Sequence, residues 1–114
     1  MFKVIGTVLV ALSILGSMPA SAADNPAPTL AMCAGVAVTL YRIAPNDVRD
    51  KYRTRGTEFA NAALVYDPNA MAMIKQEVAN NRTWLDTAAD TQAVLVKLLT
   101  TYNGCNKYAA RLGL

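Results

Sequence analysis

The fold is organised around residues 30–44, whose sequence is LAMCAGVAVTLYRIA. This stretch has no charged side chain before Arg42, and its apolar residues fall on every side of a helix with 3.6 residues per turn. A helix that is hydrophobic all round is a buried helix. The 13 residues between Pro28 and Arg42 are fewer than the roughly 20 that a membrane-spanning helix needs. The stretch therefore predicts a core helix of a soluble bundle.

The first 22 residues have the pattern of a secretory signal peptide. Lys3 precedes an uncharged run, and Ala20-Ser21-Ala22 forms a small-x-small cleavage site. An uncleaved anchor helix is the alternative, but the apolar run is short and Pro19 interrupts its extension. We therefore expect residues 1–22 to be removed by cleavage near Ala22, and the mature protein to reach the bacterial periplasm or the exterior.

A single disulfide is expected in the mature chain, which has about 90 residues. A domain of this size has a modest core and often needs a covalent cross-link. Its two cysteines, Cys33 and Cys105, permit only one pairing in an oxidising compartment. We predict that their Cα atoms lie about 4.4 to 6.8 Å apart, which is the range that a disulfide requires.

The domain organisation follows from the prolines and from helical periodicity. Residues 23–28 predict an extended tail, because each proline biases the preceding residue away from helix. Residues 29–114 predict one all-α domain, a small antiparallel four-helix bundle, since no segment shows the two-residue alternation of a strand. In an up-down-up-down bundle, the start of the first helix and the end of the fourth lie at the same end. Cys33 and Cys105 occupy those two places.

Capping residues predict where each helix begins and ends. The expected helix starts are Thr29 for the first helix, Asn46 or Asp47 for the second, Asp67-Pro68 for the third, and Thr83 or Thr87 for the fourth. The fourth helix is expected to end at Asn103-Gly104. A further short helix could extend from there to Leu112. Residues 80–82 are expected to loosen the third helix.

Apolar stripes predict which faces of these helices are buried. The expected core positions are Val48, Tyr52, Phe59, Ala63 and Tyr66 in the second helix, Met71, Ile74, Val78 and Leu85 in the third, and Ala88, Leu95, Leu99 and Tyr102 in the fourth. Gly56 lies on or beside the stripe of the second helix. We expect it to be a point of close contact with the first helix.

The absence of histidine excludes several kinds of active site. Ser-His and Cys-His nucleophiles, histidine-ligated zinc and the Glu-x-x-His sites of di-iron bundles all require that residue. The sequence also has no Cys-x-x-Cys motif and no glycine-rich phosphate loop. We therefore expect no cofactor and no recognised catalytic motif.

Two pairs of side chains are of the types that form metal or catalytic sites. Asp86 and Asp90 are one helical turn apart, a spacing that suits a metal ion or a general acid pair but is also typical of a solvated first turn. Met71 and Met73 suggest copper(I), but residues two apart on a helix point to nearly opposite sides. We expect core packing for Met71 and no metal site.

One local concentration of charge stands out on the second helix. Its members are Arg49, Lys51, Arg53 and Arg55, preceded by Arg42. Such side chains can cover an apolar stripe with their alkyl stems, or they can hold an anionic partner or a lipid surface. Without Lys3, the mature chain has a net charge of only +2. That charge is too small to indicate a nucleic acid partner.

The expected function is non-catalytic. We expect an exported helical protein that binds another envelope or extracellular protein, as an inhibitor, immunity factor, adaptor or chaperone. The first alternative is binding of a membrane surface or an anionic ligand through the basic amphipathic helix of residues 46–66. The second alternative is a small carboxylate-based enzyme or a metal-binding protein.

Overall fold

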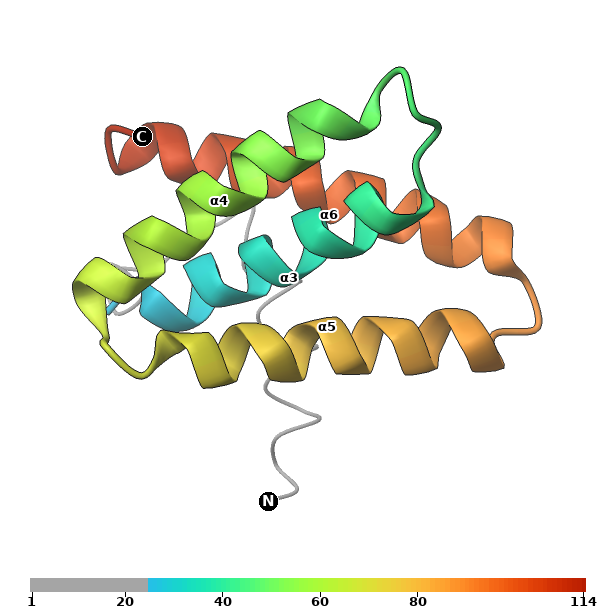
Figure 1. The fold of residues 1–114 in the computed structure, drawn as a ribbon, viewed down its shortest axis with the longest axis horizontal. Coiled ribbons are helices and arrows are strands. Elements are labelled where there is room, and N and C mark those ends of the chain that lie inside the picture. The colour runs from blue at the N-terminus through green and yellow to red at the C-terminus, as the bar shows by residue number, and fades with distance from the viewer. Residues whose placement is uncertain (1–24) are drawn as a thin grey trace.

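The computed structural model describes residues 25–114, which form four α-helices and no strand (Figure 1). The helices are α3 (Ala27–Ile43), α4 (Arg49–Tyr66), α5 (Ala70–Thr87) and α6 (Thr91–Arg111). Consecutive helices run in opposite directions and are joined by short turns. The predicted all-α four-helix bundle is therefore confirmed. The predicted signal peptide, residues 1–22, lies outside the described residues.

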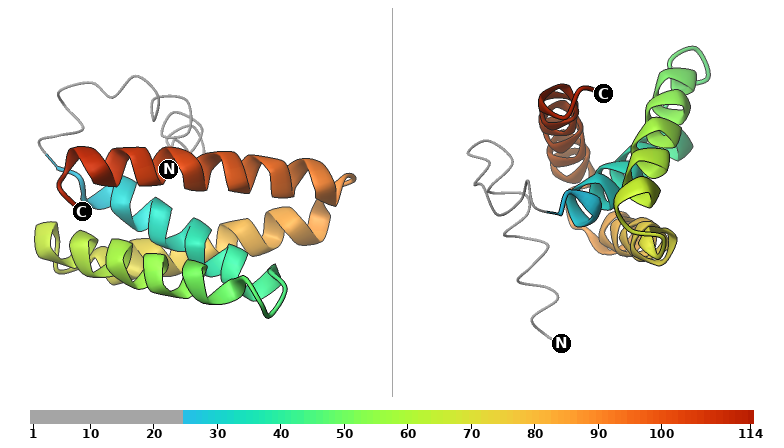
Figure 2. Two further views of the ribbon diagram at one scale, coloured as in Figure 1. Left: turned by 90° about the horizontal axis from the view of Figure 1, so that it is seen from above. Right: turned by 90° about the vertical axis from the view of Figure 1, so that its left-hand side faces the viewer.

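Helix α3 is the centre of the bundle, and the other three helices pack around it (Figure 2). Its buried residues point in every direction around the helix axis: Ala27, Leu30, Ala31, Met32, Cys33, Ala34, Gly35, Val36, Ala37, Thr39 and Leu40. This is the arrangement that the uncharged stretch predicts. Because α3 carries apolar side chains on all sides, it is stable only where other helices cover all of them.

Two glycines allow neighbouring helices to approach α3 closely. A Cβ atom added to Gly35 would lie 2.5 Å from Cβ of Glu77 on α5. A Cβ atom added to Gly56 on α4 would lie 3.2 Å from Cβ of Ala37. The predicted contact of Gly56 with the first helix is therefore confirmed.

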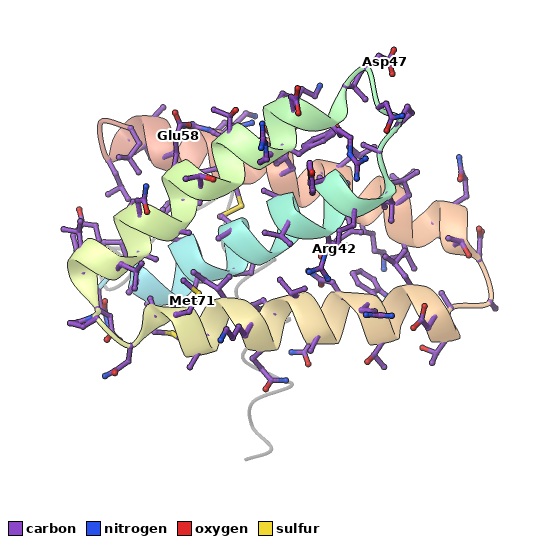
Figure 3. The ribbon with its side chains drawn as sticks, in the orientation of Figure 1. Arg42, Asp47, Glu58 and Met71 are labelled. Carbon is purple, nitrogen blue, oxygen red and sulfur yellow. A yellow bond between two sulfur atoms is a disulfide. The ribbon has the colours of Figure 1, made fainter. Side chains whose placement is uncertain are left out.

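The disulfide joins Cys33, near the start of α3, to Cys105, near the end of α6 (Figure 3). Their Cα atoms are 5.7 Å apart. The predicted pairing is thus confirmed, and with it the placement of these two helix ends at the same end of the bundle. Both cysteines are fully buried, so the bond is part of the core.

The first helix begins earlier than predicted. Helix α3 starts at Ala27, so residues 27 and 28 are helical and do not belong to an extended tail. Proline is tolerated in the first turn because the N–H that it lacks has no partner within the helix there. Oδ1 of Asn25 accepts a hydrogen bond from the amide of Ala27 (3.2 Å), a role that was expected of Thr29.

The second and third helices also begin at other residues than predicted. Helix α4 follows a turn in which the amide of Val48 donates to the carbonyl of Pro45 (3.1 Å), and neither Asn46 nor Asp47 caps it. Helix α5 starts at Ala70, because the Asp67 carboxylate accepts from the amide of Asn69 (2.9 Å) and holds residues 67–69 in a turn.

Tertiary contacts stabilise α5 at residues 80–82, where the sequence predicts a weak helix. Helix α5 is continuous to Thr87. Asn81 is buried, and its side-chain amide donates to Oγ1 of Thr39 (3.3 Å), which in turn donates to the carbonyl of Gly35 (2.8 Å). The predicted loosening at residues 80–82 is therefore wrong, because a buried partner on α3 satisfies the polar side chain.

Helix α6 begins and ends later than predicted. It starts at Thr91, with the Asp90 carboxylate accepting from the amide of Ala93 (3.2 Å), and not at Thr83 or Thr87. It then continues through residues 103 and 104 to Arg111. The left-handed residue after the helix is Gly113, with φ of 83°.

Candidate functional site

A cleft of about 920 Å³ lies at the end of the bundle where α3 stops. Pro45 cannot continue a helix, and α3 ends at Ile43. Helices α5 and α6 extend past that point before the short turn that joins them (Figure 1). The cleft lies between the end of α3, the first turns of α4, and the parts of α5 and α6 that face them.

The walls of the cleft are apolar, and charged groups are few. The apolar lining residues are Leu40, Ile43, Ala44, Pro45, Val48, Tyr52, Val78, Leu85, Leu95 and Leu99, which come from all four helices and the α3–α4 turn. Arg42, Arg82 and Asp86 supply the charged lining, and all three are exposed (Figure 3 shows Arg42 between α3 and α5). None of these three side chains forms a hydrogen bond or ion pair with another residue of the range 25–114.

Two of the four predicted partner-binding cations are engaged inside the molecule. The Arg49 guanidinium lies 4.4 Å from the ring centre of Tyr41, and its Nε donates to the Tyr41 carbonyl (3.3 Å). Nε of Arg55 donates to Oδ1 of Asn106 on α6 (2.7 Å), and Arg55 forms an ion pair with Glu58 (2.8 Å). These two arginines join α4 to α3 and to α6.

The other two cations are directed to solvent. Lys51 is exposed, with its ammonium 5.1 Å from the ring centre of Tyr52. The Arg53 side chain is 66% exposed and lies 3.8 Å from the Asp50 carboxylate. An exposed pair at this distance contributes little to stability. The structure therefore does not bring the four cations together, and their role in binding a partner stays a prediction.

The spacing of Asp86 and Asp90 suggested a shared helical face, but the two residues do not lie on one helix. Asp86 lies in the last turn of α5 and lines the cleft, whereas Asp90 caps α6. No group of three or more His, Cys, Asp or Glu side chains within residues 25–114 could hold a metal ion.

Glu77 is a carboxyl group that sequence reasoning missed. Burial against α3 raises its pKa above the ordinary value of 4.5. The Glu77 carboxyl group of the folded protein therefore binds a proton more tightly than the same group in the unfolded chain. The contribution of Glu77 to stability is most favourable below pH 4.5 and falls as the pH rises through its folded-state pKa.

Replacing Glu77 by Gln should stabilise the protein at pH 7 and leave its stability almost unchanged at about pH 3. Glutamine keeps the shape of the side chain and removes the half-buried negative charge. Urea unfolding of both proteins at the two pH values measures the difference, and effects common to both proteins cancel. A glutamine variant less stable than the wild type at pH 7 would mean that the charge has a favourable partner.

Three large apolar side chains are exposed at the opposite end of the bundle, where α4 turns into α5. They are Val65 (81% exposed), Tyr66 (49%) and Met71 (43%), and together we call them the apolar corner. The last turn of α4 projects beyond the start of α3 (Figures 1 and 2), and Val65 and Tyr66 in that turn are exposed. The expected burial of Tyr66 and Met71 is therefore wrong, and Met73 packs on the core instead of Met71.

The fold defines the structural class of this protein, which is a small helical bundle with one disulfide. A disulfide of this kind is typical of an oxidising, extracellular compartment. Within residues 25–114, no helix has the length and apolar character needed to cross a membrane. No protein-family model, no curated protein and no solved structure matches this chain.

Proposed function

We propose that this is an exported, non-catalytic protein that acts by binding another protein in the bacterial periplasm, as an inhibitor, immunity factor, adaptor or chaperone. In this proposal residues 1–22 are a signal peptide removed near Ala22. The disulfide between Cys33 and Cys105 supports export, because such bonds persist in oxidising compartments.

The observation that carries the binding proposal is the apolar corner. Val65 is 81% exposed in the last turn of α4, Tyr66 is the last residue of the same helix, and Met71 is exposed in the first turn of α5, after a three-residue turn. Exposed apolar clusters mark interaction surfaces, and tyrosine and methionine are enriched in protein interfaces. The last turn of α4 carries no basic side chain, so the contact expected there is apolar rather than ionic.

The proposal is tested by removing the apolar character of the corner. The mature protein, the double variant Val65→Gln/Met71→Gln and the control Val96→Gln are each immobilised and exposed to envelope extract. Val96 is a matched control, because it is 57% exposed on α6 and lies outside the corner. Glutamine favours helix and carries no charge, so all three proteins should keep the same circular dichroism spectrum.

We expect mass spectrometry to find a protein retained by the wild type and by Val96→Gln, with at least a tenfold lower yield on the double variant. Such a loss is the size expected when two central apolar side chains leave a contact surface. Equal retention on all three proteins, or no retention above the resin background, would contradict the proposal.

A further inference from the structure

The cleft at the end of α3 is independent of the apolar corner, because the two lie at opposite ends of the bundle. Its volume of about 920 Å³ is within the range of small-molecule sites. Like those sites, it combines a mostly apolar wall with a few charged groups. The lining comes from all four helices, so the shape of the cleft is fixed by the bundle itself.

We propose that this cleft binds a single-chain anionic amphiphile, namely a free long-chain carboxylate of the fatty-acid type. The alkyl chain lies against the walls formed by α5, α6 and the end of α3, and the carboxylate lies at the mouth with Arg42 and Arg82. This site goes beyond the proposed protein binding and does not depend on it.

The apolar wall favours an alkyl chain over a peptide segment. Leu85 of α5 faces the same space as Leu95 and Leu99 of α6, and Leu40 and Ile43 close it at the end of α3. A peptide would bring backbone N–H and C=O groups into this space, and each would lose hydrogen bonds to water without finding partners. A chain of methylene groups has no such groups to satisfy.

The two arginines favour an anionic head group. Arg42 and Arg82 are exposed at the cleft, and neither side chain has a hydrogen bond or ion pair with another described residue. Asp86 is the one carboxylate in the lining, so the charged lining carries a net charge of +1. A guanidinium group binds a carboxylate with two parallel hydrogen bonds, which suits a head group held at the edge of an apolar site.

The experiment is isothermal titration calorimetry on the mature, disulfide-bonded protein with three twelve-carbon probes below their micelle concentrations. Dodecanoate is anionic, dodecanol is neutral and dodecyltrimethylammonium is cationic. We expect saturable binding of dodecanoate at one site, at least tenfold tighter than the cationic probe. Octanoate should bind more weakly than dodecanoate, by roughly tenfold for every two methylene groups removed.

Substitutions distinguish binding in the cleft from non-specific attraction to the charged surface. The double variant Arg42→Met/Arg82→Met should lose at least tenfold in affinity for dodecanoate and should no longer prefer the anionic probe. Arg53→Met, which removes an exposed arginine outside the cleft, should bind dodecanoate like the wild type. Leu95→Asp, which places a carboxylate in the cleft, should abolish binding while the circular dichroism spectrum stays unchanged.

Several results would overturn the proposal. These are the absence of saturable dodecanoate binding, equal affinity for the anionic and cationic probes, and equal loss of affinity in Arg53→Met and the double variant. Binding of an amphipathic leucine–glutamate peptide, or of phosphatidylglycerol vesicles, without binding of dodecanoate would assign a different occupant. A dimer in sedimentation equilibrium that Leu95→Asp dissociates would assign the cleft to a second copy of the chain.

Discussion

Replacing Cys33 by serine should lower the free energy of unfolding by roughly 4 kcal/mol. The disulfide closes a loop with a sequence separation of 72 residues. In the chain-entropy model, a cross-link over a loop of this length removes a large part of the conformational freedom of the unfolded chain. Since small domains have a total stability of about 5 to 15 kcal/mol, this loss is a substantial share of it.

Urea unfolding and thermal melting followed by circular dichroism measure this effect. Cys105→Ser and the double variant should show the same loss as Cys33→Ser, because all three lack the same bond. The helical content at low temperature should change little, while the melting temperature falls. Titration of the unreduced, denatured wild type with a thiol reagent gives an independent check. Two reactive thiols per chain would show that the bond does not form in the exported protein.

Replacing Gly35 by alanine should destabilise the protein by about 1 to 3 kcal/mol. The added Cβ would lie 2.5 Å from Cβ of Glu77 and 3.4 Å from the Glu77 carbonyl carbon. These atoms belong to the helix α5 itself and cannot rotate away, so α5 would have to move from α3. Such a movement would loosen the contact along the most buried helix of the molecule.

Gly56→Ala is the matched control. The intrinsic preference for helix changes equally at both positions, and alanine gains up to about 1 kcal/mol over glycine in each helix. The added Cβ at Gly56 meets Cβ of Ala37 at 3.2 Å, a less severe approach than the one at Gly35. Chemical unfolding should therefore give a clearly larger loss for Gly35→Ala. An equal or smaller loss at Gly35 would mean that α5 moves without penalty.

Sequence patterns predicted the centre of this fold because the relevant signals are strong and local. An uncharged stretch with apolar residues on all sides can be stable only in the interior, and α3 is buried there. Two cysteines in a chain with a secretory signal pattern allow one disulfide, and its Cα distance of 5.7 Å agrees with the bundle order. The close contact at Gly56 followed from the stripe that continues through it.

Helix boundaries were predicted less well because packing overrides weak local signals. Asn103 and Gly104 can end a helix, but α6 continues past them and buries Cys105 and Tyr108 in the core. Asn81 has a poor preference for helix, yet its side chain donates a buried hydrogen bond to Thr39. In both cases the gain from tertiary contacts exceeds the propensity difference, which is less than about 1 kcal/mol per residue.

The candidate sites depend on how far each helix extends relative to its neighbours, and periodicity does not contain that information. Arg42 and Arg82 are 40 positions apart in the chain and line one cleft, at the end of the bundle where α5 and α6 extend past the end of α3. Tyr66 continues an apolar stripe but is exposed, because α4 runs past the start of α3. A stripe predicts which side chains can be buried. Whether they are buried depends on a neighbouring helix that is long enough to cover them.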